Sequence, residues 1–286
     1  MTTLLVHLHV FYHEQVDYFL SKLGSIRDCD WDLVVTFSER RQQTEDRIRA
    51  FKPDARFMEV ENVGYDVWPF IKVLKSPDAK DYRYILKLHT KNVDPHVNKV
   101  NGLKLNGSRW RDILVDSLLG SPVRFADCLR RMESDSRSGF IYAYELKRRR
   151  SKGMTGIIHE AKRIGVSELG GEYASGTMFL ARTEALRTIA EADISSEMFA
   201  KDRSRSHSRI SLAHVYEQLI CFAMQDAGYR ALRAPAGTAD SVRVFVHRMV
   251  SPVLKFVFSL EREGTDDAKV LTVLGVKLKM GSDKTV

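Results

Sequence analysis

The segment 62–70 reads NVGYDVWPF and combines three residues that suit a binding loop. Gly64 can adopt a positive φ or let a ligand approach the backbone, while Asn62 and Asp66 offer short polar side chains. The alternative is structural, with Asp66 capping a helix that begins near Pro69. The spacing alone favours the capped helix over the binding loop.

A second polar group, His89-Thr90-Lys91, ends the apolar run of residues 82–91. His89 and Lys91 alternate with Thr90, so both can face the same side of a sheet and form a cationic lip together with Lys87. Lysine and histidine can neutralise phosphate oxygens. The alternative is a solvated strand end. Neither GxGxxG nor GxxxxGK[ST] occurs in the chain, so no motif supports a dinucleotide or P-loop site.

Two pairs on predicted helices could also take part in binding or catalysis. Trp110 and Arg111 place an aromatic ring beside a guanidinium, which suits a sugar face or a phosphate; the alternative is a packed tryptophan and a surface arginine. His214 and Glu217 lie one helical turn apart, so they share a face. A carboxylate near a cleft could act as a general base, although a lone glutamate is more commonly a surface residue.

Metal and disulfide chemistry find little support in the sequence. His7 and His9 lie in the first apolar run without a cysteine or carboxylate cluster at metal-ligand spacing, so we interpret them as core or cleft histidines. Cys29, Cys128 and Cys221 form no CxxC pair. They predict neither a disulfide framework nor a zinc site and favour a reduced, cytoplasmic protein.

Apolar runs typical of buried strands alternate with helical patterns along most of the chain. The expected strands span residues 3–11, 31–37, 55–62, 82–91, 138–145 and 176–182, and a long helix is expected within 212–232. This alternation predicts a mostly parallel α/β sheet. Ligands of such sheets bind at the carboxyl ends of the strands, near the point where strand order reverses. The two polar groups described first follow the third and fourth expected strands.

The chain has 286 residues and a formal net charge of +8, which favours an anionic partner without identifying it. Its first residues, MTTLLVHLHVFYHE, are expected to form a core strand rather than a signal peptide. The late apolar segment 242–260 contains Arg243, Arg248 and Lys255, so it is not expected to span a membrane. The basic run 147–152 (KRRRSK) is typical of a solvated loop and less often of an anion-binding or membrane patch.

These motifs in series resemble the rhamnan synthesis protein F family, which assembles polysaccharides and is regarded as a glycosyltransferase family. The most specific matches are N-x-G-x-D-x-x-P-F, K-x-H-T-K and G-T-M-F, and the resemblance extends from about His7 to Tyr229. It implies a GT-A-like, Rossmann-type sheet flanked by helices in one large domain, 1–240. The donor half would be about 1–145 and the acceptor half about 146–240. The resemblance covers residues 241–286 only weakly; their apolar part, 242–260, is expected to contact a membrane surface or a partner, and the alternative is a strand and helix that cover the core.

The resemblance also implies roles for individual residues. GT-A enzymes usually end the equivalent strand in a DxD that holds a divalent metal, whereas this strand ends in His89-Thr90-Lys91, and the DCD at 28–30 lies in a connection before the second expected strand. Lys91 and His89 are therefore expected to do the metal's electrostatic work, with no metal ion or other cofactor. Glu217 would be the general base of an inverting transfer. The other expected site residues are His9, Asn62, Gly64, Asp66 and Thr90 on the donor side, and Trp110, Arg111, Gly176, Thr177 and His214 on the acceptor or phosphate side.

The expected protein is thus a cytoplasmic glycosyltransferase with a sugar donor and a glycan acceptor as its two substrates. The donor would be a nucleotide-sugar, with dTDP-rhamnose as one candidate, and the acceptor a growing surface glycan, free or lipid-linked. Peripheral contact with the inner face of the membrane is a further expectation. Two alternatives stay open: a non-catalytic glycan-binding scaffold of the same fold, and a basic nucleic-acid-binding protein. No recognisable nucleic-acid module occurs, so nucleic acid is not an expected partner.

Overall fold

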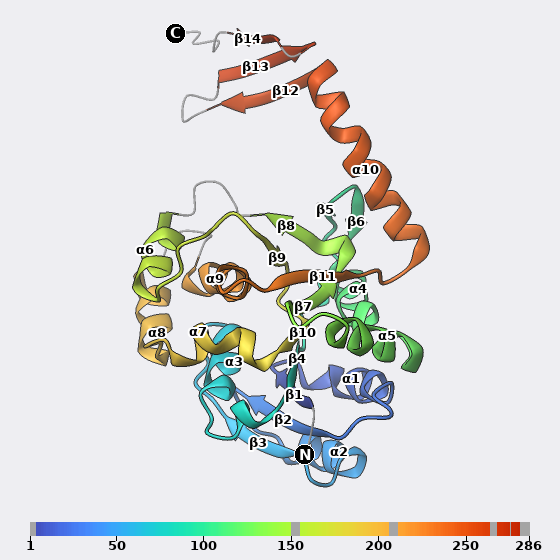
Figure 1. Ribbon diagram of the computed structural model, residues 1–286, viewed down its shortest axis with the longest axis vertical. Helices are drawn as coiled ribbons and strands as arrows, with labels where there is room; N and C mark the ends of the chain where they lie inside the picture. The colour runs from blue at the N-terminus through green and yellow to red at the C-terminus, as the bar shows by residue number, and fades with distance from the viewer. Residues whose placement is uncertain (1–3, 150–154, 206–210, 264–267, 275, 281–286) are drawn as a thin grey trace. The chain divides into compact units, whose positions relative to one another are not determined.

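A computed structural model describes residues 4–149, 155–205, 211–263, 268–274 and 276–280 (Figure 1). The chain divides into two compact units. The first unit comprises Met1–Asn98 and Leu105–Gly237, and the second comprises Lys99–Lys104 and Thr238–Val286. The second unit thus takes in a short piece of the region expected to belong to the donor half.

A seven-stranded sheet forms the centre of the first unit, in the order β11-β7-β10-β4-β1-β2-β3. Its strands are β1 (Leu4–Val10), β2 (Trp31–Phe37), β3 (Arg56–Glu59), β4 (Tyr84–His89), β7 (Ser138–Ala143), β10 (Phe179–Arg182) and β11 (Arg230–Ala234). Every neighbouring pair is parallel except those of β10, which runs antiparallel to both β4 and β7. The expected mostly parallel α/β sheet is confirmed.

Helices cover both faces of this sheet (Figure 1). On one face lie α1 (Val16–Leu23), α2 (Gln42–Phe51), α4 (Gly107–Leu119) and α5 (Pro122–Glu133); on the other lie α3 (Val67–Leu74), α7 (Arg187–Glu191) and α9 (Leu212–Asp226). The remaining elements of this unit are α6 (Thr155–Arg163), α8 (Ser196–Arg205), β8 (Lys147–Arg149) and β9 (Glu172–Ala174). Continuous apolar runs form the central strands because those strands are buried on both faces.

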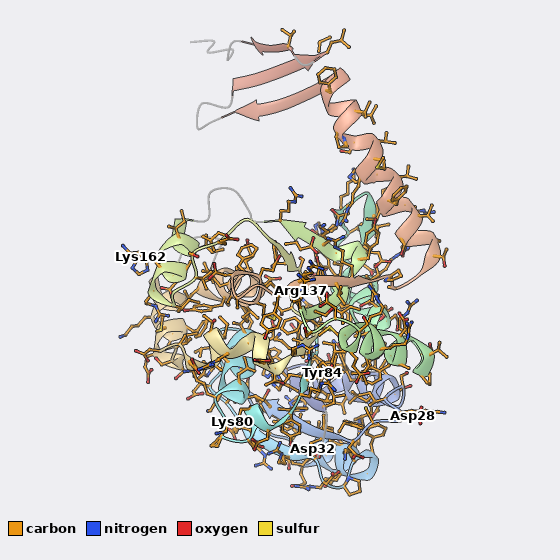
Figure 2. The ribbon with its side chains drawn as sticks, viewed as in Figure 1. Asp28, Asp32, Lys80, Tyr84, Arg137 and Lys162 are labelled. Atoms are coloured by element: carbon orange, nitrogen blue, oxygen red, sulfur yellow. The ribbon has the colours of Figure 1, made fainter. Side chains whose placement is uncertain are left out.

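Side chains on the central sheet are buried, whereas those at the edge of the unit are exposed to solvent. Tyr84 begins β4 and is fully buried, and Figure 2 shows it within the layer of side chains around the sheet. Lys80 and Lys162, also labelled there, are exposed at the periphery. The core therefore follows the apolar strands that the sequence predicts.

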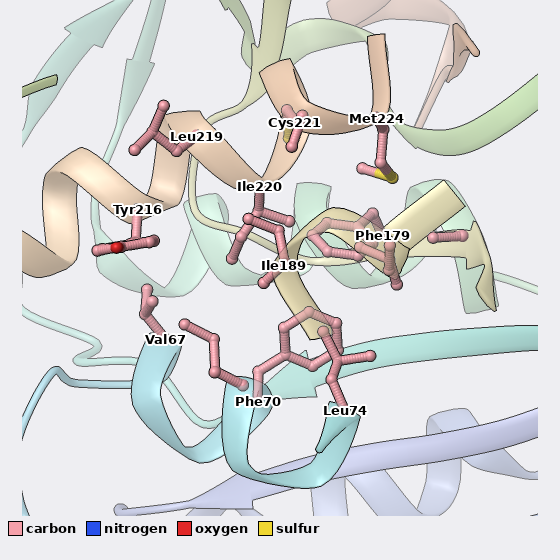
Figure 3. Packing of buried hydrophobic residues seen from close by; sticks show 14 of the residues in the cluster. Val67, Phe70, Leu74, Phe179, Ile189, Tyr216, Leu219, Ile220, Cys221 and Met224 are labelled. Atoms are coloured by element: carbon pink, nitrogen blue, oxygen red, sulfur yellow. The ribbon is translucent and has the colours of Figure 1, made fainter. Parts of the chain in front are cut away.

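Packing between α3 and α9 fixes the segment 62–70. Val67 and Phe70 of α3 face Tyr216 and Ile220 of α9 across a buried cluster that also includes Phe179 of β10 (Figure 3). All five side chains are at most 2% exposed. The loop before α3 is consequently anchored to the same helix that carries Glu217.

Several expected boundaries shift for identifiable reasons. The third strand was expected over 55–62 and is shorter in the structure, where β3 spans Arg56–Glu59. The sixth is shorter than 176–182, because Gly176 and Thr177 both adopt positive φ angles, 91° and 46°, which are incompatible with extended strand. The long helix within 212–232 ends at Asp226, before Gly228 at a φ of 86°.

The second unit contains a long helix and a small sheet. Helix α10 spans Thr238–Val257, and the antiparallel strands β12 (Phe258–Glu263), β13 (Ala268–Val273) and β14 (Val276–Met280) follow it. The short hairpin strands β5 (Asn98–Val100) and β6 (Leu103–Leu105) straddle the boundary between the two units in sequence. No helix within the described part of the chain is long and apolar enough to cross a membrane.

Candidate active site

A cavity of about 710 Å³ lies where β1 and β4 end, within the first unit. The strand order reverses between these two strands, since β1 continues to β2 and β3 on one side and pairs with β4 on the other. His9 and His89 are register partners at this point. The cavity thus occupies the position where open α/β sheets bind their ligands.

Twelve of the thirteen residues expected at the site line this cavity. They come from the ends of β1 and β4, the loop before α3, the start of α4, the turn before β10 and the first turns of α9: His9, Asn62, Gly64, Asp66, His89, Thr90, Lys91, Trp110, Gly176, Thr177, His214 and Glu217. Residues far apart in sequence are therefore brought together in one place.

Arg111 is the one expected residue that does not line the cavity. Its guanidinium carbon lies 3.8 Å from the centroid of the Tyr18 ring, and its Nε and Nη2 donate to Asp112 Oδ1 at 3.1 and 2.9 Å. Because Trp110 and Arg111 are consecutive on a helix, their side chains point in directions about 100° apart. The structure thus places Trp110 at the cavity and Arg111 outside it, where Arg111 packs on Tyr18 and is 15% exposed rather than a surface side chain.

Asp66 holds the capping position of α3 but makes no capping hydrogen bond. Its Oδ2 instead accepts hydrogen bonds from Lys87 Nζ and from Thr177 Oγ1. Lys87 Nζ also donates to the backbone oxygen and to Oγ1 of Thr177, each at 2.9 Å. We call Asp66, Lys87 and Thr177 the floor of the site. The capped-helix interpretation of Asp66 is wrong, because its carboxylate is turned to the sheet.

Lys87 is not part of a cationic lip, contrary to expectation. Its side chain is fully buried, and Asp66 is 17% exposed. The ammonium has three protons, and Asp66 and Thr177 supply three acceptor atoms. Burial tends to raise the pKa of Asp66, but His89, Lys87 and the hydrogen bonds from Lys87 and Thr177 hold it well below its ordinary value. The floor is therefore an ion pair whose charges cancel internally.

The histidines of the site are built into its wall. His89 Nε2 lies 2.8 Å from the Gly176 carbonyl oxygen, and Nδ1 lies 3.1 Å from that of Thr90. Burial lowers the pKa of His89, and it lowers the pKa of His9 to about 4. His9 Nδ1 is 3.0 Å from Thr36 Oγ1. Burial thus disfavours the charged form of both rings, so Lys91 is the better placed source of positive charge for a ligand.

Thr90 joins the ends of the two central strands. Its Oγ1 accepts hydrogen bonds from the backbone N–H groups of Phe11 and Tyr12, both at 2.9 Å, and its own N–H donates to the His9 carbonyl oxygen at 2.9 Å. The hydroxyl therefore fixes the chain as it leaves β1. Phe11 and Tyr12 line the cavity as a result.

A cationic rim surrounds Trp110. Lys91 Nζ lies 5.4 Å and the Arg148 guanidinium carbon 5.7 Å from the indole centroid. Neither cation is ion-paired within the described residues. We call Lys91, Trp110 and Arg148 the rim: Lys91 and Trp110 line the cavity, and Arg148 lies beside Trp110 without lining it. Sequence reasoning missed Arg148 because the run 147–152 looked like a solvated loop; Lys147 to Arg149 form β8, and residues 150–152 lie outside the described part.

The loop of Asn62, Gly64 and Tyr65 forms another wall of the cavity. Gly64 has a φ of 67°, and a Cβ there would lie 2.9 Å from the Phe199 ring. Tyr65 has a φ of 52°, unusual for a bulky residue, and its side chain is 68% exposed. Its ring meets His214 edge-on, 5.9 Å between centroids. Tyr65 is a second residue that the sequence reasoning missed, and only its position between Gly64 and Asp66 could have indicated it.

Glu217 enters the cavity from the first half of α9. Its Oε1 accepts a hydrogen bond from the Gly176 N–H at 2.7 Å. Burial raises the pKa of this carboxyl above its ordinary value, an effect that the Gly176 hydrogen bond partly opposes. His214 and Ser211 form a capping box at the start of the same helix. A carboxylate whose pKa is raised toward neutrality has the property that a general base requires.

Potential metal ligands do not gather at this site. Within the described ranges, no group of three or more histidine, cysteine, aspartate or glutamate side chains is arranged to hold a metal ion. Asp66 and His89 approach each other, with Oδ2 and Nε2 3.7 Å apart, but both already contact the Gly176–Thr177 segment.

The chain belongs to the rhamnan synthesis protein F family, whose sequence profile matches residues 1–229. Two curated relatives from strains of Xanthomonas campestris pv. campestris, both named uncharacterized protein WxcX, are 25% identical to it over 234 residues. The match covers 79% of this chain and 32% of each relative, so this chain spans about a third of their length.

Solved structures of two other proteins are similar to this chain at low sequence identity. S. aureus TarS 1–349, also solved with UDP, has a TM-score of 0.43 at 11% identity, over 88% of this chain and 66% of that one. The galactosyltransferase LgtC in complex with donor and acceptor sugar analogues has a TM-score of 0.40 at 12% identity, over 76% and 70%.

Proposed function

We propose that this protein is a glycosyltransferase of surface-polysaccharide assembly, which moves a sugar from a nucleotide-sugar to a glycan acceptor. One observation carries the proposal: a single cavity at the strand-order reversal brings together Lys91, which has no ion-pair partner among the described residues, and a carboxylate, Glu217, whose pKa is raised. Membership of the rhamnan synthesis protein F family supports the same process. It also makes dTDP-rhamnose a candidate donor.

The rim is proposed to bind the donor diphosphate. Lys91 and Arg148 each place a positive charge beside the Trp110 ring, 5.4 and 5.7 Å from its centroid, and an anion bound there is attracted by both. Asp66 does not repel that anion strongly, because Lys87 neutralises it. Its Oδ1 makes no hydrogen bond within the described residues and is suited to accept one from a sugar hydroxyl.

The transfer is proposed to be a single displacement with inversion. Glu217 accepts the proton of the acceptor hydroxyl as that oxygen attacks the anomeric carbon. The bond between this carbon and the phosphate oxygen breaks, and its electron pair leaves with the nucleoside diphosphate. Lys91 stabilises the charge that develops on the leaving group, a role that a divalent metal fills in other enzymes.

A thermal-shift panel of nucleotide-sugars tests the donor assignment directly. A donor that binds only the folded protein raises its melting temperature by mass action, and dTDP- and UDP-sugars, free sugars and short oligonucleotides form the panel. We expect a shift with at least one nucleotide-sugar and none with oligonucleotides. A shift with saccharides alone, without transfer, would indicate the glycan-binding scaffold instead, and salt-sensitive oligonucleotide binding would indicate the nucleic-acid-binding alternative.

Metal dependence is tested with the active donor in a transfer assay. We expect turnover to survive EDTA, since Lys91 provides the positive charge without a metal. Loss of turnover in EDTA with recovery on adding manganese or magnesium would show that this part of the proposal is wrong.

We also propose that the second unit contacts an anionic membrane surface on the cytoplasmic side, where a lipid-linked acceptor would be found. Helix α10 exposes an apolar stripe at helical spacing, Val242, Phe245, Val246, Met249, Val253 and Phe256, each at least 51% exposed. Exposed Arg243 and His247 lie beside it, so the helix combines apolar and basic surface.

Vesicle flotation tests this contact. Binding to phosphatidylglycerol vesicles, weaker binding to neutral phosphatidylcholine vesicles and loss of binding on Phe245→Asp are expected. Val123→Asp, at an 80% exposed valine of α5, is the matched control. Equal binding by both variants, or no binding by the intact chain, would contradict the proposal.

A further inference from the structure

Two consecutive residues, Gly176 and Thr177, contact four ionisable side chains of the site: Asp66, Lys87, His89 and Glu217. The Gly176 N–H donates to Glu217 Oε1 at 2.7 Å, and the Gly176 carbonyl oxygen lies 2.8 Å from His89 Nε2. Gly176 therefore contacts the proposed general base through its N–H and the end of β4 through its carbonyl oxygen.

Thr177, the second residue of the dipeptide, also makes several hydrogen bonds within the site. Its hydroxyl donates to Asp66 Oδ2 and accepts from Lys87 Nζ, and its carbonyl oxygen accepts from Lys87 Nζ at 2.9 Å. Thr177 is 2% exposed. A hydroxyl with a charged donor and a charged acceptor has a defined orientation, since it donates in one direction and accepts in the other.

The backbone of the dipeptide is strained at a residue type that avoids this conformation. Thr177 is β-branched and has a φ of 46°, a backbone conformation that such residues rarely adopt. Gly176 has a φ of 91°, and a Cβ there would lie 2.9 Å from Leu114 and 3.2 Å from Trp110 Nε1. Hydrogen bonds help to hold the threonine in this geometry: its N–H donates to the Ala174 carbonyl oxygen at 2.9 Å, and its hydroxyl takes part in two of the others.

We propose that Thr177 is a positioning residue that couples the donor and acceptor sides of the site. Its hydroxyl sets the orientation of the Asp66 carboxylate, and the backbone conformation it stabilises presents the Gly176 N–H to Glu217. One oxygen of each carboxylate is thereby fixed, while Asp66 Oδ1 and Glu217 Oε2 have no partner within the described residues. Those two oxygens are the ones that meet substrate hydroxyls; this assignment of substrate rests on the proposed function.

Three variants separate the hydroxyl from the bulk of the side chain. Thr177→Val removes the hydroxyl at nearly constant volume, and Thr177→Ser keeps it. Thr183→Val is the matched control, because the Thr183 hydroxyl is buried without a hydrogen-bond partner in the described chain. We expect Thr177→Val to lower kcat on the order of 10-fold to 100-fold, the range for a lost hydrogen bond to a charged group. Thr177→Ser should restore most of it, and Thr183→Val should resemble the wild type.

The decisive measurement is the pKa of Glu217, read by NMR titration of carboxyl-labelled glutamate, which needs no turnover. The Gly176 hydrogen bond favours the ionised form, so displacing the dipeptide in Thr177→Val should raise this pKa further, and Thr177→Ser should return it. An unchanged Glu217 pKa in Thr177→Val, or equal effects of valine and serine, would overturn the inference. Absence of transfer by the wild type would overturn the proposed function alone, because the titration is independent of it.

Discussion

The floor and the rim of the cavity differ in the burial and ion pairing of their charged side chains. In the floor, Lys87 is fully buried and its ammonium group donates hydrogen bonds to Asp66 and Thr177. In the rim, Lys91 and Arg148 lie beside Trp110 without a carboxylate partner in the described residues. A lysine is thus structural in one region and available in the other, although the two lysines are only four positions apart.

This difference separates the preorganisation of the site from its contact with ligand charge. Buried ion pairs hold neighbouring groups in a fixed geometry, but their opposite charges neutralise each other and do not attract a charged ligand. Unpaired cations at a cavity mouth attract anions and respond to salt. We therefore expect loss of the buried Lys87–Asp66 ion pair to act mainly on stability, and changes in the rim to act on donor binding.

The largest expected effect on folding is that of Lys87→Met. Removing the buried ammonium leaves Asp66 without its counter-charge, which should cost about 3–5 kcal/mol of unfolding free energy. Lys22→Met is the control, since the Lys22–Asp116 pair is 28% and 33% exposed and should contribute about 0–1 kcal/mol. Urea titrations of both variants compare the two costs. Equal losses would remove the distinction between a buried floor and an ordinary ion pair.

The pH dependence of transfer should follow next in size. Glu217 must be ionised to act as a base, and burial raises its pKa. The acid limb of kcat/KM should therefore lie above the pKa of an ordinary glutamic acid, with activity falling about 10-fold per pH unit below it. A limb at the ordinary value would argue that another group is the base.

Stability should depend on Glu217 in the opposite sense from a salt-bridged acid. A raised pKa in the folded state means that stability is lost as pH rises through that pKa. Glutamine at this position can still accept from the Gly176 N–H and avoids the buried charge. Melting temperatures at neutral pH should therefore be equal or higher in Glu217→Gln than in the wild type.

Lys91→Gln should have a moderate effect that is confined to binding. Loss of the rim cation is expected to weaken nucleotide-sugar binding about 10-fold with little change in melting temperature. The remaining affinity should also be less sensitive to salt. Lys80→Gln, at an exposed lysine that does not line the cavity, is the control for general charge. An equal loss in both variants would show that the rim has no special role.

The smallest effect is expected for Arg111→Ala. This side chain packs on Tyr18 outside the cavity, so donor binding and turnover should stay at wild-type values. A clear rise in KM would show that Arg111 contributes to donor binding together with Trp110, so that the rim extends along α4.

Much of the fold could be predicted because apolar runs report burial directly. β2 matches the expected 31–37, and the resemblance to the rhamnan synthesis protein F family is confirmed over residues 1–229. The antiparallel direction of β10 was not visible, since a short apolar segment has the same pattern in either direction.

The candidate site was predicted as a set of residues but not as a set of contacts. Alternation along β4 shows which side chains share a face, yet it cannot show that Asp66, 21 positions away, lies opposite Lys87. Lys87 was consequently expected in a lip and His89 as a charged group. Arg148 was hidden in a basic run, because charge patterns do not reveal which cation meets an aromatic ring.

The most direct test of the central claim compares turnover and donor binding in Glu217→Gln. The account predicts that transfer falls on the order of 10²–10⁴-fold, the contribution of general base catalysis, while the thermal shift caused by the nucleotide-sugar is kept. Turnover close to that of the wild type would contradict the assignment of this cavity as a glycosyltransfer site with Glu217 as its base.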